Sequence, residues 1–380
     1  MLKVCIVSGP FGKIGGIERF ILELNNRLCD KVKFTLVVPR AYTKTEDAEK
    51  WLKSYPNVSS IKWIEYERRK LGKLNMPKDA RYVTREFEDS DVIYFTTLSP
   101  VSNFYLYTVA VVKYGSKLIY GSHTKYVAKE VVREKNRVKM YANRFRRWIM
   151  LNSANTIHVV NRDDLEEFSK EGRRVFYAPP MFAGLGRRSI IHRGNKFVAL
   201  LVARLDTYNK GLDILIDIVH RKQMKDIEFR IVGEGPDRKY FEEECRGLRN
   251  IKILGQLNEN ALEREYEKAK LFVFPSRFEN FGLALLEAQM RGIPAVAFDI
   301  TGPRDIIRKG QGALVEPFSA DRFAKSVLQY YNMWKGNKMR YKNMMKDIVI
   351  DISRRFNAKT TAEKMYRVFK EVADESKFQK

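Results

Sequence analysis

Cysteine and histidine are scarce in this chain of 380 residues, which contains three cysteines and four histidines. Cys5, Cys29 and Cys245 stand far apart, so the sequence offers neither a disulfide framework nor a zinc-binding cluster. Four histidines also leave little material for a metal centre built from several imidazoles. We therefore expect a reducing, cytoplasmic location and no resident metal or other cofactor.

Long hydrophobic runs are absent as well. The apolar run Val4–Val7 is shorter than the 7–15 residues that the core of a signal peptide requires. The most apolar later stretch, Phe104–Val112, has about half the length that crosses a bilayer. The sequence thus predicts a protein that is soluble or peripheral on the cytoplasmic face of the membrane.

Positive charge is abundant: 71 Lys and Arg face 46 Asp and Glu, which gives a net charge of +25. With 44% hydrophobic residues the composition is that of a globular protein, so intrinsic disorder is excluded. A chain this basic favours acidic partners, such as nucleic acid, a phosphorylated substrate or an anionic membrane. Because the charge is evenly spread and no recognition motif occurs, we expect no nucleic-acid partner.

The two halves of the chain open in the same way, with a strand, a loop, a helix and a second strand. This repeat predicts an α/β fold of two Rossmann-like doubly wound domains that face each other across a cleft. We expect an N-terminal acceptor-binding domain over residues 1–185 and a C-terminal nucleotide-sugar-binding domain over 186–380, whose last helix can pack back on the first domain. The elements that carry the repeat are the strands Lys3–Val7, Phe34–Pro39, Lys196–Val202 and Phe229–Val232, with the helices Ile17–Leu28 and Gly211–His220.

Two loops of the second half follow predicted strands and suit a phosphate ligand. Arg204 and Lys210 lie in a polar loop that leads into a helix, whose N–H groups and dipole would add to their charge. Gly233 belongs to the loop Val232–Pro236 at the next strand end, where α/β sheets place ligands. Taken alone, Arg204 and Lys210 can equally be solvated cations of a surface loop, and the Gly233 loop can equally be a tight turn. These alternatives stay open here.

Glu279 and Glu287 bracket the start of a further helix, eight residues apart. One precedes the helix N-terminus at Gly282 and the other lies about two turns inside. Carboxylates at this spacing can hold two hydroxyl clusters of one elongated ligand, while the N–H groups near Gly282 face an anion. An exposed helix glutamate is the ordinary interpretation of Glu287, but its neighbours Leu286 and Ala288 are apolar.

Together these residues resemble the retaining glycosyltransferases of family 4, which have the GT-B fold. The resemblance covers nearly the whole chain and is strongest from Val202 to Leu314, where the E-x7-E pair is highly specific. The segments that carry it are VARLDTYNKGLDILID, IVGEGP, FPSRFENFGLALLEAQMRGIPAVA and GPRDII. It implies transfer of a hexose-type sugar, with retention of configuration, from a nucleotide-diphosphate sugar to a glycan or lipid-linked acceptor. We expect a UDP-sugar rather than a GDP-sugar.

The resemblance also implies roles for single residues. Arg204 and Lys210 would bind the diphosphate, Glu279 hydroxyls of the transferred sugar, and Glu287 the nucleotide ribose. The expected donor site is completed by Gly233, by Asn280 and the backbone around Phe281, Gly282 and Leu283, and by the glycine loop of the first domain with Gly15 and Gly16. His123, after the strand Lys117–Tyr120, matches the position of an active-site histidine. The expected catalytic set is His123, Arg204, Lys210 and Glu279.

The chemistry follows from the residue types. Breaking a sugar–phosphate bond leaves an oxocarbenium-like centre and a diphosphate of growing negative charge, which cations and helix N-termini stabilise most in the transition state. No D-x-D motif stands at a strand end, so we expect a metal-independent reaction. With no placed nucleophile, we expect attack on the same face, the leaving phosphate accepting the proton of the acceptor.

Residues 125–149 hold nine basic residues against two glutamates. At helical spacing, Val127, Phe145, Trp148 and Ile149 share an apolar face, and Lys129 and other basic residues share the opposite face. One interpretation is a surface helix whose apolar stripe packs on its domain. The other is a basic face that binds an anionic membrane surface or a lipid-phosphate acceptor.

Other classes remain as alternatives. A sugar-nucleotide epimerase could use the same scaffold, but it gives no reason for the E-x7-E pair beside Arg204 and Lys210. A phosphorylase would need a pyridoxal-phosphate lysine motif, which is absent. A basic nucleic-acid-binding protein would explain the charge alone.

Overall fold

The computed structural model divides the chain into two compact units. Unit 1 comprises residues 1–183 and 356–380, and unit 2 comprises residues 184–355. The last helix of the chain therefore belongs to unit 1, and the division lies two residues before the expected boundary. The structure describes residues 1–9, 11, 15–39, 52–53, 55–71, 74–78, 80–97, 101–123, 145, 148–149, 151–181 and 194–378.

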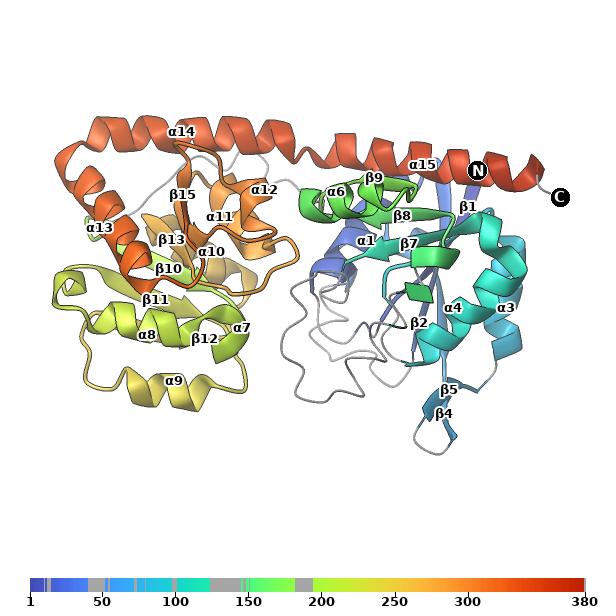
Figure 1. Ribbon diagram of the computed structural model, residues 1–380, viewed down its shortest axis with the longest axis horizontal. Coiled ribbons are helices and arrows are strands. Elements are labelled where there is room, and N and C mark those ends of the chain that lie inside the picture. Colours follow the sequence, from blue (N-terminus) through green and yellow to red (C-terminus); the bar gives the residue numbers. More distant parts are fainter. Residues whose placement is uncertain are drawn as a thin grey trace. The chain divides into compact units, whose positions relative to one another are not determined.

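Unit 1 is a parallel sheet of seven described strands in the order β3-β2-β1-β6-β7-β8-β9. Its central strands are apolar along their length because helices cover both faces (Figure 1). α1 and α15 pack on one face, and α3 and α4 on the other. The elements are β1 (Leu2–Val7), α1 (Gly16–Leu28), β2 (Val32–Pro39), β3 (Lys62–Tyr66), the hairpin β4 (Arg68–Leu71) and β5 (Leu74–Pro77), α3 (Ala80–Asp89), β6 (Val92–Phe95), α4 (Val101–Tyr114), β7 (Leu118–Ser122), β8 (Thr156–Val159), α6 (Arg162–Lys170), β9 (Val175–Tyr177) and α15 (Ala358–Phe378).

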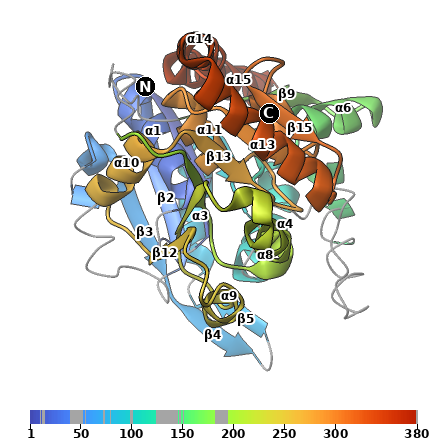
Figure 2. The same ribbon diagram turned by 90° about the vertical axis from the view of Figure 1, so that its left-hand side faces the viewer.

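Unit 2 repeats this architecture with a parallel sheet of six described strands in the order β12-β11-β10-β13-β14-β15. α8 and α13 lie side by side on one face, as Figure 2 shows, and α10 and α11 pack on the other. The elements are β10 (Val198–Val202), α7 (Thr207–Lys210), α8 (Leu212–His220), β11 (Glu228–Val232), α9 (Arg238–Glu244), β12 (Ile251–Gly255), α10 (Glu259–Lys268), β13 (Leu271–Phe274), α11 (Leu283–Met290), β14 (Ala295–Phe298), α12 (Pro303–Ile306), β15 (Gly312–Val315), α13 (Ala320–Gly336) and α14 (Lys338–Arg355).

The expected fold of two doubly wound α/β domains is confirmed, and two local expectations are corrected. The polar loop before Lys210 contains the short helix α7, because the Asp206 side chain accepts the amide of Asn209 at 3.0 Å and caps it. The polar stretch Glu259–Lys270 predicts a helix, but helix α10 ends at Lys268. The amide of Lys270 donates instead to the carbonyl of Val198 at 2.8 Å and so joins the sheet.

Of the basic segment 125–149 only Phe145, Trp148 and Ile149 belong to the described residues. Ile149 packs against the core of unit 1, as expected for the apolar stripe. Phe145 and Trp148 are 59% and 62% exposed, and their rings stack with centroids 6.3 Å apart. The expectation that these two rings pack on the domain is therefore wrong: of this stretch, Ile149 and Leu151 contact the core, whereas Phe145 and Trp148 face solvent.

Candidate functional site

The carboxyl ends of β10 and β13 bring together two of the predicted catalytic residues. Lys210 ends α7, after β10, and its Nζ forms an ion pair with Oε1 of Glu279, in the loop after β13. The two side chains are only 20% and 14% exposed. The Ser276 hydroxyl donates to the same oxygen at 3.5 Å. Residues 69 apart in sequence thus form one charged pair at the edge where parallel sheets bind ligands.

Two glycines allow the loops of this edge to approach each other. Gly211, directly after Lys210, has φ 63° and lies against the loop after β13, where an added Cβ would overlap the carbonyl oxygen of Pro275. Gly233 has φ 140°, and its Cβ would overlap the carbonyl oxygen of Ala203. Only glycine combines such backbone angles with such close packing. The expected Gly233 loop therefore lies beside the loop that carries Arg204 and Lys210.

Arg277 fastens the loop after β13 to α8 and was not predicted from the sequence. Its guanidinium donates to both carboxylate oxygens of Asp213, at 2.7 and 2.6 Å, and to the carbonyl of Tyr208 at 3.2 Å. The amide of Arg277 donates to the carbonyl of Asn209 at 2.9 Å. A bidentate pair of this kind fixes geometry as well as charge. Arg277 and Asp213 therefore hold the loops on either side of Lys210 and Glu279.

Arg204 is exposed and, within the described part of the chain, makes no hydrogen bond or ion pair through its side chain. The next residue, Leu205, is buried, and its amide donates to the carbonyl of Glu234 at 3.0 Å. The backbone at Arg204 is thus held against the Gly233 loop while its guanidinium faces solvent. A free cation on a fixed backbone is suited to an incoming anion.

The N-terminus of α11 completes the edge. Gly282 is the N-cap residue with φ 98°, and its carbonyl accepts the amide of Leu286 at 3.0 Å. The first N–H groups of the helix, from Leu283 onward, have no partner within the helix itself. Phe281 is buried and anchors the turn, and Asn280, beside it, is half-buried. All four expected residues therefore lie at one helix start, next to Glu279.

Glu287 lies inside α11 and is 9% exposed. Its Oε2 accepts the hydroxyl of Tyr266, on α10, at 2.8 Å. The Tyr266 ring packs against the guanidinium of Arg291, 4.2 Å from the ring centroid. Tyr266 is thus a partner of Glu287 that the sequence did not reveal, since a tyrosine in a polar helix carries no signal of such a contact. The role of Glu287 toward a ribose stays a prediction.

In unit 1, Gly15 caps α1 and Gly16 is its first residue. The amide of Gly15 donates to Oε2 of Glu18 at 2.8 Å, so a carboxylate of the chain occupies this helix start. Burial raises the pKa of Glu18. The role of these glycines toward a diphosphate stays a prediction.

His123 lies directly after β7, at the carboxyl edge of the unit 1 sheet, and is half-buried. Its Nε2 is 2.6 Å from the hydroxyl of Tyr94, on β6. The same hydroxyl is 2.7 Å from Nδ1 of His158, on β8. Burial, with the neighbouring His158, holds the pKa of His123 well below its usual value. The sequence did not reveal that Tyr94 and His158 are neighbours of His123, because both belong to short apolar strands, in which a buried structural role is expected.

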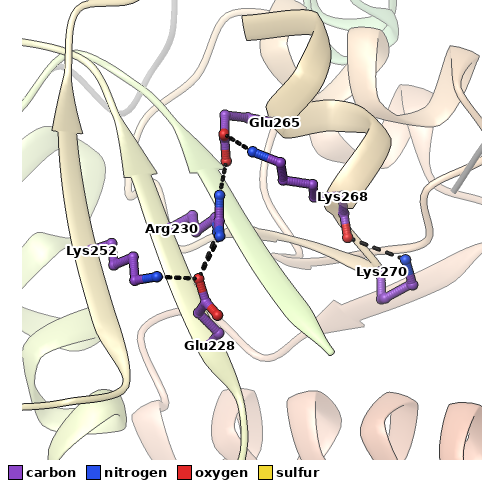
Figure 3. Close-up of polar contacts among 6 residues, drawn as sticks. All are labelled: Glu228, Arg230, Lys252, Glu265, Lys268 and Lys270. Carbon is purple, nitrogen blue, oxygen red and sulfur yellow. Dashed lines mark hydrogen bonds and ion pairs between the residues drawn. The ribbon is translucent and has the colours of Figure 1, made fainter. Parts of the chain in front are cut away.

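A second dense group of charges in unit 2 lies at the amino ends of the strands. Figure 3 shows Arg230 between Glu228 and Glu265, with both nearest contacts at 2.7 Å. Lys252 pairs with Glu228 at 3.2 Å, and Lys268 with Glu265 at 2.7 Å. Glu228 is the first residue of β11, so this network is at the edge opposite to Lys210 and Glu279. We assign it to the stability of the sheet.

Metal and membrane features were sought in the residues that the structure describes. There, no three His, Cys, Asp or Glu side chains are placed to share a metal ion. No helix in this part of the chain combines the length and the apolar character that a membrane span requires.

Two family models match the chain. The model described as Glycosyl transferases group 1 matches residues 186–347, and the model described as Glycosyltransferase Family 4 matches residues 14–180. The matches adjoin without overlap and cover most of both units. Both models describe glycosyltransferases, and together they match most of the chain. The chain belongs to the glycosyltransferases. This result does not favour the epimerase or nucleic-acid-binding alternatives.

Individual relatives of this glycosyltransferase match in part. An uncharacterized glycosyltransferase of Methanocaldococcus jannaschii is 34% identical over 43% of this chain and 43% of the relative. The GDP-mannose-dependent alpha-mannosyltransferase of Corynebacterium glutamicum is 34% identical over 34% of this chain and 31% of the relative. The chain thus spans less than half the length of these curated relatives.

The fold also resembles solved structures. The Anabaena protein HepE, in complex with UDP-glucose, is 17% identical over 98% of this chain and 100% of that chain, with a TM-score of 0.74. At this identity the likeness concerns the fold alone.

Proposed function

We propose that this glycosyltransferase moves a hexose-type sugar from a UDP-sugar to a glycan or lipid-linked acceptor, with retention of anomeric configuration and without a metal. The observation that carries the proposal is the Lys210–Glu279 pair at the carboxyl edge of unit 2, beside the N-terminus of α11. A cation, a carboxylate and a helix N-terminus are the three groups that a sugar diphosphate needs: two for its phosphates and one for its hydroxyls.

The roles of the residues follow from their charge and exposure. Lys210 and the exposed Arg204 neutralise the diphosphate as the bond to the sugar breaks, when its negative charge grows. Glu279 accepts hydrogen bonds from sugar hydroxyls, and donor binding would exchange its contact with Lys210 for these. Glu287 binds the ribose. The C1–oxygen bond to phosphate breaks, a C1–oxygen bond to the acceptor forms on the same face, and the acceptor proton passes to the leaving phosphate.

Two relatives bear on the donor. HepE is solved with UDP-glucose, and the Corynebacterium relative is named for GDP-mannose. We favour the UDP-sugar, and the experiment has to include both nucleotides. We further propose a cytoplasmic enzyme that is peripheral at the membrane through residues 125–149, where the acceptor would be lipid-linked. The exposed rings of Phe145 and Trp148 support this, because aromatic side chains favour the interface of a bilayer.

The test is release of nucleoside diphosphate by the full chain from UDP-glucose, UDP-N-acetylglucosamine and GDP-mannose, with and without EDTA. We expect a UDP-sugar to react best, EDTA to leave the rate unchanged, and NMR to find the α-anomer of the sugar as the first product of an α-linked donor. A strict requirement for Mg²⁺ or Mn²⁺, restored when metal is added back, would contradict the metal-free mechanism. A β-anomer would contradict retention.

A further inference from the structure

Three side chains of unit 1 form a continuous hydrogen-bonded chain that ends at His123. Nε2 of His123 lies 2.6 Å from the Tyr94 hydroxyl, and this hydroxyl lies 2.7 Å from Nδ1 of His158. Nε2 of His158 lies 2.8 Å from the carbonyl oxygen of Ala178. The chain crosses three neighbouring strands, β6, β7 and β8, on the face that α1 and α15 cover.

The carbonyl at one end fixes the direction of every hydrogen bond. A carbonyl oxygen can only accept, so Nε2 of His158 carries a proton and donates it to Ala178. A neutral imidazole has one N–H, so Nδ1 of His158 accepts from the Tyr94 hydroxyl. Because the Tyr94 hydroxyl donates its single proton to His158, it must accept a hydrogen bond from Nε2–H of His123. Nδ1 of His123 is then left without a proton.

The surroundings keep both imidazoles neutral. Burial, with a smaller contribution from the positive charge of Lys364 on α15, lowers the pKa of His158 to about 4. Burial and His158 lower the pKa of His123, and burial with the neighbouring Tyr120 raises that of Tyr94 well above its usual value. Aromatic rings from α1, β9 and α15 pack around these three side chains. The distances between ring centroids are 5.1 Å for Phe20 and His123, 4.9 Å for Phe176 and His158, and 6.0 Å for Phe369 and Tyr94.

The strand end provides the space for the chain. Gly121, on β7, pairs in register with His158. A Cβ added to Gly121 would lie 2.6 Å from the Tyr94 hydroxyl oxygen and 2.9 Å from Cδ2 of His123. Any larger residue would push the hydroxyl from its position between the imidazoles. The glycine is therefore part of the arrangement.

We propose that Tyr94 and His158 are positioning residues that hold His123 in the Nε2–H tautomer, so that its Nδ1 can only accept a hydrogen bond. This part of the inference rests on the proposed function. An Nδ1 that can only accept a hydrogen bond selects an uncharged hydroxyl of the sugar at His123, and it disfavours an anion such as the carboxylate of a uronic acid. The His123 ring is partly exposed, and no hydrogen bond within the described part of the chain occupies its Nδ1.

Acid reverses the polarity of this chain. A proton on Nδ1 of His158 would turn the Tyr94 hydroxyl toward Nε2 of His123, which must then carry its own proton on Nδ1. A proton taken up by His123 itself also removes the acceptor at Nδ1, although the Tyr94 hydroxyl then keeps its direction. Since the pKa of His158 is about 4, the acceptor at Nδ1 persists at neutral pH and is lost in acid.

The direct test is long-range ¹H–¹⁵N NMR of the full chain labelled at histidine. With four histidines, each can be assigned from one His→Gln variant. We expect His123 as the Nε2–H tautomer at pH 7 in the wild type, and a mixture of tautomers in Tyr94→Phe. The matched control is Tyr107→Phe, which removes another buried hydroxyl of unit 1, 3.1 Å from Ser153. It should leave the His123 signals unchanged. An Nδ1–H tautomer in the wild type, or no change in Tyr94→Phe, would overturn the proposal.

Two variants of His158 distinguish the effect of its hydrogen bonds from the effect of its bulk in the core. The amide of His158→Gln can donate to Ala178 and accept from Tyr94, so it should preserve the tautomer of His123, whereas His158→Leu should lose it. Loss in both variants would show that bulk, not direction, matters. In kinetics, kcat/KM of the wild type should favour UDP-glucose over UDP-glucuronate at least tenfold, and Tyr94→Phe should narrow that ratio. Equal rates in the wild type would overturn the selectivity. No turnover of these or of any other UDP-sugar would overturn the proposed function, whereas the tautomer is measured without any substrate.

Discussion

At the residue scale, Lys210 and Glu279 form an ion pair, and removal of either side chain leaves the other without this counter-ion. We predict that Lys210→Ala and Glu279→Ala each lower kcat/KM at least tenfold, because a lost charged hydrogen bond costs about 1.5–3 kcal/mol. Because the two side chains touch, the double variant should lose less than the sum of the single losses. Steady-state kinetics with the best donor measures all three.

The control for this prediction is Lys268→Ala. Lys268 also belongs to an ion pair, with Glu265 at 2.7 Å, but at the opposite edge of the sheet (Figure 3). It should retain the kinetics of the wild type. Turnover like that of the wild type in Lys210→Ala or Glu279→Ala would refute the assignment of the site.

Site residues could be predicted from the sequence where a local motif places them, and could not where the pairing of distant strands places them. Lys210, Glu279 and Arg204 stand at strand ends in motifs of fixed spacing, so their position follows from local pattern. Tyr94 and His158 lie in separate apolar strands, and only the register of β6, β7 and β8 brings them to His123. A single sequence contains no signal of that register, and the same is true of Tyr266 beside Glu287.

At the scale of the element, the junction of α7 and α8 depends on Gly211. We predict that Gly211→Ala lowers the free energy of unfolding by clearly more than the roughly 1–2 kcal/mol that a left-handed backbone costs an L-residue, because the new Cβ also overlaps the Pro275 carbonyl. Activity should fall as well, since Lys210 is the preceding residue. Urea denaturation followed by circular dichroism gives the stability.

Gly247 offers a matched control for that change. It lies in the same unit with φ 84°, and an added Cβ would find nothing within 4 Å. Gly247→Ala therefore isolates the cost of the backbone angle. Equal destabilisation by the two variants would mean that the close approach to Pro275 contributes nothing.

Elements were predictable where hydrophobic pattern and turn residues agree. The short apolar runs Leu271–Phe274 and Ala295–Phe298 are flanked by proline or glycine and predict strands, and the structure has both strands with these bounds. Helix α7 could not be expected from pattern, since four polar residues held by one side-chain cap have no periodicity. The end of α10 was misplaced because the pairing of Lys270 with β10 is a tertiary contact.

At the scale of the whole molecule, the net charge of +25 and the segment 125–149 bear on the acceptor. A general excess of charge attracts any anionic surface, whereas a dedicated membrane site depends on particular residues. Phe145 and Trp148 are exposed and are neighbours in sequence of basic residues, and they add an apolar contribution that salt does not screen. The two kinds of attachment therefore respond differently to salt.

We predict that the full chain floats with vesicles of phosphatidylglycerol and phosphatidylcholine at low salt and less so at 1 M salt, where the Debye length is about 3 Å. Reversal of Lys129, Arg133 and Arg137 to Glu should abolish flotation, since each basic residue near an anionic leaflet contributes about 1 kcal/mol. Phe145→Ser with Trp148→Ser should remove the fraction that persists at high salt. The control reverses Lys338, Arg340 and Lys342, exposed residues of α14, and so changes the net charge equally. If that control loses flotation to the same degree, the attraction comes from net charge alone, and residues 125–149 are not a membrane site.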